Sequence, residues 1–237
     1  MQLVVLAGGF GTRLRGSIRE GLPKPMAEIA GKPFIVHLLD RAIDQGADRI
    51  HLLVGYAAQV IIDYLGDSYG DVPVTYSRED EPLGTGGALK AAQQYLADTF
   101  ILANGDTFAD VSFRELLDLL EVGVLALSLA HMSDSSRYGT VDVADGVVIG
   151  FREKRDGAAG LVNAGVYACR KELLDLFPGK SSFSFEREFL EPELSRIQPQ
   201  FLLTASEIID IGTPESLALA NNVFARNSST SHFDRRT

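Results

Sequence analysis

The sequence predicts an α/β fold with an open, mixed and mostly parallel sheet that helices flank on both faces. Two observations support this class. Short apolar segments of strand length alternate with segments of helical periodicity through the first half of the chain. Glycine-rich or acidic turns follow several of the apolar segments. Such turns are typical of the carboxyl ends of strands in open parallel sheets, which is where these sheets bind their ligands.

The first half of the chain indicates strand and helix in alternation. Parallel neighbours need helical crossovers, so this order is typical of a Rossmann-like sheet. Strands are expected at Leu3–Leu6, Arg49–Val54, Val74–Ser77, Thr99–Ala103 and Val124–His131. Helices are expected at Phe34–Gln45, Ala57–Leu65, Gly87–Leu96 and Phe113–Glu121.

The pattern changes in the second half, where Asp145-Gly146 indicates a hairpin between two short strands. We expect one domain over residues 1–226, with a first part of about 1–131 and a mixed second part of about 132–226. The polar residues 227–237 lack periodicity and are expected to form a disordered tail. The strands expected here are Thr140–Val143, Val147–Arg152, Leu161–Ala168, Phe201–Thr204 and Ile208–Ile211, and the helices are Lys171–Phe177, Phe185–Leu194 and Pro214–Ala225.

Charge and composition exclude several classes of protein. The formal net charge of −10 argues against binding to nucleic acid or to an anionic membrane. No apolar run approaches the roughly 20 residues of a membrane helix, and the first residues do not form a signal-peptide pattern. The single cysteine, Cys169, cannot form an internal disulfide, which suits the cytoplasm. The sequence leaves monomer and homodimer equally open.

The segment LAGGFGTRL, Leu6 to Leu14, follows the first expected strand. It lacks the lysine of the GxxxxGK[ST] phosphate loop, and Leu14 stands where the third glycine of GxGxxG is needed, which disfavours a hydride-transfer enzyme. From Gly11 to Lys32 there are five basic and two acidic residues, a local charge of +3 in an acidic protein. The segment therefore predicts an anion site.

Six segments, in order, resemble the sugar-1-phosphate nucleotidyltransferase family: GGFGTRL with PKP, then EPLGTGG, NGD, EK, NAG and DIG. They span Leu3 to about Ala225. The resemblance implies the nucleotide-diphospho-sugar transferase fold, which is GT-A-like, and in-line attack of a sugar 1-phosphate on the α-phosphorus of a nucleoside triphosphate with release of pyrophosphate. A phosphate monoester with a second pKa of about 6 is mostly dianionic at pH 7, so the attack needs no general base.

The resemblance implies that the nucleotide lies on the opening loop. There Arg13 neutralises the pyrophosphate portion, and Lys24, held between two prolines, contacts phosphates at the reacting centre. From its position, Glu79 or a nearby carbonyl is expected to accept the N1 and N2 hydrogens of guanine. The implied nucleotide-binding residues are Leu6, Ala7, Gly8, Gly9, Gly11, Thr12, Arg13, Lys24, Glu79, Gly84 and Thr85.

Asp106 and Asp210 match the family's magnesium-binding pair, and the implied cofactor is Mg²⁺. Each follows an apolar strand candidate, so both can converge on one edge of the sheet. Two carboxylates suffice, because Mg²⁺ takes most of its other ligands from substrate phosphates and water. Like charges held close together also need a cation between them. Arg13, Lys24 and Asp106 are the implied catalytic residues.

The sugar phosphate is implied to bind in the second half of the chain, where Glu153 would bond sugar hydroxyls and Lys154 the phosphate. Asn163 interrupts an apolar strand, which is costly unless its amide is bonded, and sugar hydroxyls would bond it. The implied sugar-phosphate-binding residues are Asn104, Tyr138, Gly139, Glu153, Lys154 and Asn163.

The segments EPLGTGG, RYGTV and FSFE resemble the guanylyl branch of the family, which favours GTP with a heptose or mannose 1-phosphate and a nucleotide sugar for surface glycans as product. A UTP- or dTTP-dependent enzyme, for example one acting on N-acetylmuramate 1-phosphate, stays open. So does a catalytically silent regulator that binds nucleotide or sugar phosphate. The regulator is disfavoured because Arg13, Lys24, Asp106, Lys154 and Asp210 are all present.

Overall fold

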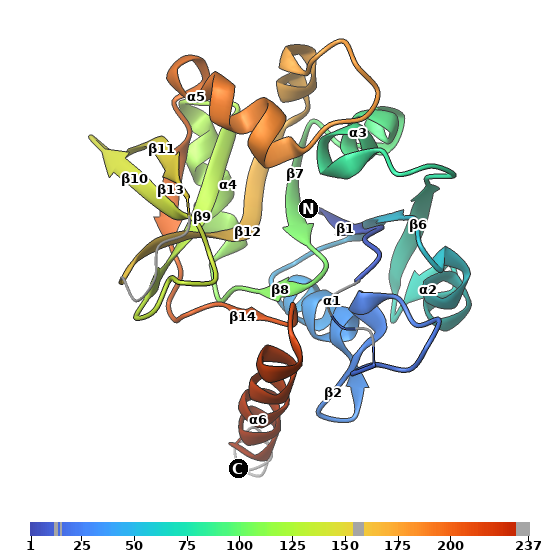
Figure 1. Cartoon of the computed structure of the whole chain (residues 1–237). Coiled ribbons are helices and arrows are strands. Elements are labelled where there is room, and N and C mark those ends of the chain that lie inside the picture. The colour runs from blue at the N-terminus through green and yellow to red at the C-terminus, as the bar shows by residue number, and fades with distance from the viewer. Residues whose placement is uncertain (12–13, 15, 154–158, 231–237) are drawn as a thin grey trace.

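A mixed sheet forms the centre of the computed structural model, which describes residues 1–11, 14, 16–153 and 159–230, the last four of these by their backbone only. Its ten strands lie in the order β10-β11-β13-β9-β12-β7-β1-β4-β6-β5 (Figure 1). The strands are β1 (Gln2–Ala7), β4 (Arg49–Val54), β5 (Ser68–Tyr69), β6 (Val72–Arg78), β7 (Thr99–Asn104), β9 (Leu125–Met132), β10 (Thr140–Ala144), β11 (Val147–Arg152), β12 (Gly160–Arg170) and β13 (Gln200–Leu203).

Strands β1, β4, β6 and β7 of the first half are parallel, as predicted, whereas the short strand β5 is antiparallel to β6. β1 pairs with β4 and with β7, and β4 pairs with β6, all in parallel. In this register Leu6 lies beside Leu53 on one side and Asn104 on the other. The turns after these strands therefore meet at one edge of the sheet.

The second half joins the first through the long strand β12, which is antiparallel to both β7 and β9. The predicted hairpin is present as β10 and β11, and β13 pairs with β9 in parallel. The mixed α/β fold is thus confirmed, with its antiparallel pairs concentrated in the second half. Two short ladders lie outside the main sheet: β2 (Glu28–Ile29) with β3 (Lys32–Pro33), and β8 (Thr107–Phe108) with β14 (Ile209–Asp210).

Helices cover both faces of the sheet, as predicted. Leu3 and Val5 of β1 belong to one buried cluster and Val4 to the other, as the alternation of a strand requires. One face is covered by α1 (Phe34–Asp44), α2 (Ala58–Leu65), α4 (Phe113–Asp118) and α6 (Pro214–Thr230). The other is covered by α3 (Gly84–Ala91), α5 (Glu191–Ile197), the 3₁₀ segment η5 (Lys171–Leu176) and the π-helix η6 (Phe185–Leu190). The remaining 3₁₀ segments are η2 (Lys24–Met26), η3 (Gln93–Tyr95) and η4 (Leu119–Glu121).

Helix α3 begins at Gly84, three residues before the predicted start at Gly87, and ends at Ala91. Glycine lowers helix propensity, but packing decides here. A Cβ on Gly86 would lie 2.2 Å from the Phe183 ring, and one on Gly87 would lie 2.3 Å from the carbonyl oxygen of Ser181. These glycines therefore let the helix approach the segment before η6.

The predicted helix over Phe185–Leu194 is divided into the π-helix η6 and the helix α5. Pro192 has no N–H to donate to the preceding turn, which accounts for irregular hydrogen bonding at this point.

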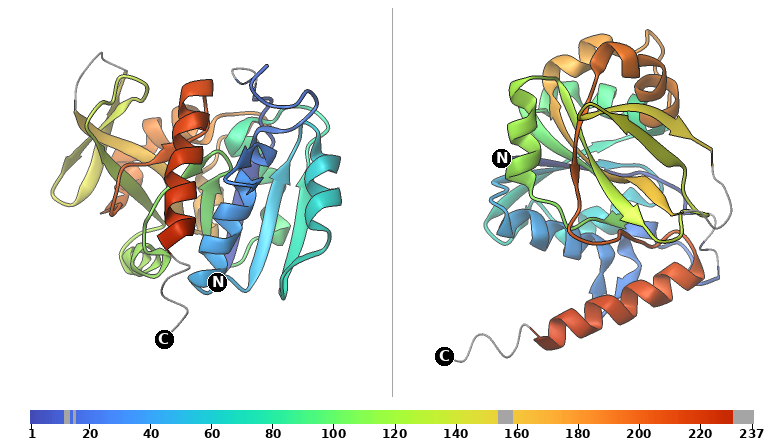
Figure 2. Two further views of the ribbon diagram at one scale, coloured as in Figure 1. Left: turned by 90° about the horizontal axis from the view of Figure 1, so that it is seen from below. Right: turned by 90° about the vertical axis from the view of Figure 1, so that its left-hand side faces the viewer.

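Helix α6 runs alongside α1 (Figure 2). The centroids of the Phe224 and His37 rings lie 4.2 Å apart, and the Ala30 amide donates a hydrogen bond to the Asn221 side chain. The helix continues to Thr230, past the predicted end at Ala225, and no glycine or proline interrupts it after Pro214. Residues 227–230, expected in a disordered tail, are thus helical, and 231–237 lie outside the described residues. Within the part of the chain described, no helix is both long and apolar enough to cross a bilayer.

Candidate active site

A cavity of about 300 Å³ opens where the carboxyl ends of β1 and β7 meet helix α3. It gathers residues from six separate segments of the sequence, among them the opening loop, the EPLGTGG segment and the NGD segment. Ten residues predicted to bind substrates or metal line it: Leu6, Ala7, Gly8, Gly9, Lys24, Glu79, Gly84, Thr85, Asn104 and Asp106.

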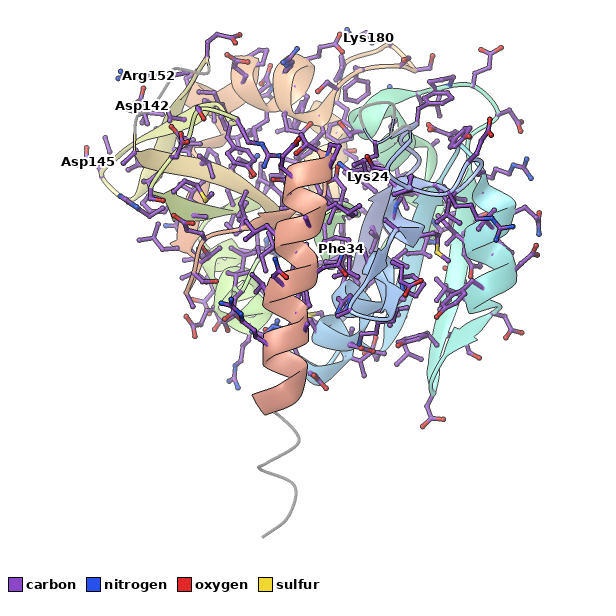
Figure 3. The ribbon with its side chains drawn as sticks, turned by 60° about the horizontal axis from the view of Figure 1, so that its bottom comes forward. Lys24, Phe34, Asp142, Asp145, Arg152 and Lys180 are labelled. Atoms are coloured by element: carbon purple, nitrogen blue, oxygen red, sulfur yellow. The ribbon has the colours of Figure 1, made fainter. Side chains whose placement is uncertain are left out.

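Lys24 is almost buried, with its side chain 11% exposed, and its ammonium reaches the cavity. Pro23 precedes the short helix η2 and Pro25 lies inside it, so the backbone of Lys24 is stiff. Gly11, in a left-handed conformation, passes over the Lys24 side chain: a Cβ there would lie 3.1 Å from the Lys24 Cβ. Figure 3 places Lys24 near the first turn of α6, far from the outer hairpin that carries Asp142 and Arg152.

Lys24 is held by Asp106, whose carboxylate lies 2.5 Å from the Lys24 Nζ. The Asp106 side chain is 40% exposed and also accepts a hydrogen bond from the Thr107 hydroxyl at 3.1 Å. The cavity floor therefore carries an ammonium and a carboxylate side by side.

Glu79, the expected acceptor for guanine, lies in the cavity wall. Its carboxylate accepts a hydrogen bond from the Leu83 amide at 3.0 Å. It also packs on the backbone of Gly8 and Gly55, where an added Cβ would come within 2.6 and 2.5 Å of it. The acid is thus held rigidly between the first two glycine-rich turns.

Glu186 also lines the cavity, although it was not among the predicted site residues. It projects from η6 and accepts hydrogen bonds from the Thr85 hydroxyl at 3.1 Å and the buried Tyr167 hydroxyl at 3.3 Å. Phe10, 53% exposed, lies beside Tyr56 at the cavity mouth, with the ring centroids 5.4 Å apart. The sequence offered one indication of Glu186. It is the acidic residue that ends the segment FSFE, in which phenylalanine and polar residues alternate.

Apart from Asn104, the predicted sugar-side residues lie in the second half of the chain, and those that the structure describes are not among the residues that line this cavity. Asn163 does not need a sugar to satisfy its amide: it donates to the Tyr167 hydroxyl at 2.7 Å and accepts from the Gly165 amide at 3.0 Å. Gly139 packs on the Arg152 carbonyl, and Glu153 is exposed. Thr12, Arg13 and Lys154 lie outside the described residues.

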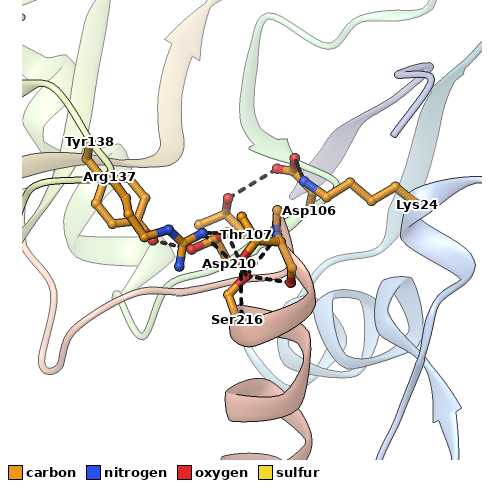
Figure 4. Close-up of polar contacts among 9 residues, drawn as sticks. Lys24, Asp106, Thr107, Arg137, Tyr138, Asp210 and Ser216 are labelled. Carbon is orange, nitrogen blue, oxygen red and sulfur yellow. Dashed lines mark hydrogen bonds and ion pairs between the residues drawn. The ribbon is translucent and has the colours of Figure 1, made fainter. Parts of the chain in front are cut away.

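Asp210 is the most strongly bonded carboxylate of the region (Figure 4). One oxygen accepts from Arg137 at 2.8 Å, the Gly212 amide at 2.7 Å and the Ser216 hydroxyl at 3.2 Å, and the other accepts from the Tyr138 hydroxyl. Burial alone would raise the pKa of Asp210, but these hydrogen bonds and the charge of Arg137 hold its pKa below the ordinary value. Burial and the contact with Asp210 raise the pKa of Tyr138.

The short ladder of β8 and β14 brings the two aspartates to the same place. Thr107 pairs with Asp210, and the Ile211 amide donates to the Asp106 carbonyl at 3.0 Å. The inference that only a shared metal ion could hold both carboxylates there is wrong, because Lys24 pairs with Asp106 and Arg137 with Asp210. Carboxylate oxygens nevertheless fit Mg²⁺. Among the described residues no cluster of three or more His, Cys, Asp or Glu could hold a metal, so beyond the two aspartates such an ion would take its ligands from water or from phosphate.

The chain belongs to the nucleotidyl transferase family, whose pattern it matches over residues 2–227. D-glycero-alpha-D-manno-heptose 1-phosphate guanylyltransferase of Campylobacter jejuni subsp. jejuni serotype O:2 is 38% identical over 216 residues, which are 91% of this chain and 96% of that protein. The crystal structure of HddC from Yersinia pseudotuberculosis is similar, with a TM-score of 0.84 and 38% identity over 94% of this chain and 99% of that one. HddC complexed with GMP-PN gives a TM-score of 0.82, 37% identity and the same coverage.

Proposed function

We propose that this protein is a sugar-1-phosphate guanylyltransferase. It joins GTP to D-glycero-alpha-D-manno-heptose 1-phosphate, or to mannose 1-phosphate, and releases pyrophosphate. The observation that carries this proposal is the cavity in which the glycine-rich turns, the ammonium of Lys24 and the carboxylate of Asp106 converge. Similarity over nearly the whole chain to a heptose 1-phosphate guanylyltransferase supports it.

In this proposal the chain's task is to bring anions together. The amides of Gly8 and Gly9 approach the triphosphate closely, which a side chain at these positions would prevent. Lys24 neutralises charge at the reacting α-phosphate, where charge grows as the sugar phosphate attacks. Arg13 is proposed to neutralise the pyrophosphate. Asp106 and Asp210 would hold Mg²⁺, which when bound would supply further positive charge to the phosphates.

Guanine is proposed to bind at the Glu79 side of the cavity. Its N1 and N2 hydrogens need an acceptor, and the rigidly held Glu79 carboxylate is one. HddC, which is 37% identical, crystallised with the guanine nucleotide GMP-PN, which supports GTP rather than UTP or dTTP.

The sugar is proposed to bind between the cavity and the second half of the chain. Asn104 and Glu186 offer an amide and a carboxylate to hydroxyl groups from the cavity wall. Tyr138, Gly139, Glu153, Lys154 and Asn163 stay candidates for the remaining contacts. The GDP-sugar product would serve in surface glycan synthesis.

A panel assay tests the proposal: four nucleoside triphosphates against several sugar 1-phosphates, with pyrophosphate release as the readout. The highest kcat/KM is expected for GTP with the heptose or mannose 1-phosphate, and Lys24→Ala serves as the inactive control. Turnover with UTP or dTTP ten times better than with GTP would contradict the guanylyl assignment. Nucleotide binding without pyrophosphate release from any pair would point to a silent regulator.

A further inference from the structure

Arg137 lies at the candidate metal site and was not among the residues predicted to bind substrates or metal. Its Nη2 lies 2.8 Å from the Asp210 carboxylate and 3.4 Å from the Ser216 hydroxyl. The guanidinium also lies over the Tyr138 ring, 5.6 Å from its centroid. Arg137 is 73 residues from Asp210 in the sequence, so only the tertiary structure brings them together.

Two cations flank the same point of the site. A Cβ placed on Gly212 would lie 3.6 Å from the Lys24 Nζ and 3.7 Å from the Arg137 Nη2. Lys24 is paired with Asp106 and Arg137 with Asp210. Positive and negative side chains therefore alternate across the site, and each aspartate is neutralised without any metal ion.

This arrangement leaves little room for a further ligand on one oxygen of Asp210, while the other oxygen has the Tyr138 hydroxyl as its partner. The oxygen that faces Arg137 already accepts three hydrogen bonds, more than its two lone pairs accommodate well. The Gly212 amide belongs to the backbone turn before α6 and cannot withdraw without moving that turn. Arg137 can withdraw, because its side chain is 41% exposed whereas that of Asp210 is 11% exposed.

We propose that Arg137 is a positioning residue that competes with a divalent cation for Asp210. It holds the Asp210 carboxylate in place in the metal-free protein and releases it when the cation binds. This rests on the proposed function, in which Asp210 is a metal ligand. The competition has a direction that a merely structural role does not share: losing Arg137 tightens metal binding instead of weakening it.

The test is the affinity of the nucleotide-free protein for Mn²⁺ alone, measured from the electron paramagnetic resonance signal of the free ion. Arg137→Gln removes the charge and keeps a polar side chain. Arg137→Lys keeps the charge. Arg41→Gln is the matched control, because Arg41 pairs with Asp110 through the same atoms at 2.6 Å and its side chain is about as exposed as that of Arg137, although Asp110 is more exposed than Asp210.

Arg137→Gln is expected to bind Mn²⁺ about three to ten times more tightly than the wild type, as follows from losing one partly exposed charged hydrogen bond. Arg137→Lys and Arg41→Gln are expected to bind like the wild type. In thermal unfolding, Arg137→Gln should start at a lower Tm and gain more from Mn²⁺, since a ligand that binds only the native state stabilises it.

Unchanged or weaker Mn²⁺ binding by Arg137→Gln would overturn the competition. Asp210→Asn separates this failure from failure of the proposed metal site. If Asp210→Asn weakens Mn²⁺ binding while Arg137→Gln does not tighten it, only the role of Arg137 is wrong. If Asp210→Asn binds Mn²⁺ like the wild type, Asp210 is not a ligand and both proposals fall.

Discussion

The ammonium of Lys24 and the carboxylate of Asp106 lie 2.5 Å apart, although 82 positions separate them in the sequence. Both line the cavity that also contains the opening glycines. The pair holds the lysine in place in a site that must otherwise collect anions. In the proposed reaction its ammonium would move from this carboxylate to a phosphate.

Replacing Lys24 should abolish most of the activity. Lys24→Ala removes the positive charge closest to the proposed reacting centre, and kcat/KM for pyrophosphate release should fall by about 100- to 1000-fold. Lys32→Ala is the control, because Lys32 forms a more exposed ion pair, with Asp40, away from the cavity. Retention of activity within tenfold of the wild type would exclude Lys24 from the reaction.

Asp210→Asn should impair both stability and activity. The asparagine keeps the shape, but the charged hydrogen bond from Arg137 weakens, so the free energy of unfolding in urea should fall by about 1–3 kcal/mol. Mg²⁺-dependent turnover should fall by orders of magnitude, because metal charge stabilisation is worth several kcal/mol. A double variant with Asp106→Asn should be hardly less active than either single variant, as for residues that act as one unit. Wild-type turnover by either single variant would rule out the metal pair.

Gly86→Ala should destabilise the protein through packing. The new Cβ would lie 2.2 Å from the Phe183 ring, and an overpacked core costs about 1–3 kcal/mol. In a double variant of Gly86→Ala with Phe183→Leu, part of the lost stability should return, because leucine is smaller than phenylalanine and leaves room for the new Cβ. Gly179→Ala is the control, since a Cβ there would meet no atom within 4 Å. Equal Tm values for Gly86→Ala and Gly179→Ala would contradict the close approach of α3 to this segment.

His51 should make the protein less stable as the pH falls below neutrality. The ring is fully buried between the Thr75 and Ser77 hydroxyls, at 2.8 and 2.9 Å, and burial lowers its pKa to about 4. The unfolded chain has a histidine pKa of about 6.5, so it binds the proton first. The stabilisation is complete above pH 6.5 and is lost towards pH 4, by about 3 kcal/mol in total.

Urea unfolding between pH 4.5 and 7.5 measures this dependence. His51→Gln should flatten it, whereas His131→Gln, at an exposed position, should not. Some slope should remain in His51→Gln, because burial also lowers the pKa of His37. An unchanged slope in His51→Gln would show that His51 does not contribute.

Much of the cavity could be predicted from the sequence because it is built from turns that follow strands. β4 lies at Arg49–Val54, as the apolar pattern predicted, and the parallel pairing places its end beside that of β1. Contacts between distant segments were not predictable in this way. Arg137 contacts Asp210, and Glu186 contacts Thr85 across 101 positions. Neither contact can be inferred from the pattern of neighbouring residues.

The sequence by itself determined the alternation of strands and helices, the position of the glycine-rich turns and the residue types that suit phosphate and metal, since these depend on neighbours a few positions apart. The tertiary structure alone decided which partner each polar side chain takes. Asn163 is satisfied by Tyr167 and Gly165 without a sugar, and Asp210 is neutralised by Arg137 without a metal. A buried polar or charged group must find a partner, but which partner it finds depends on the packing of segments far apart in the chain.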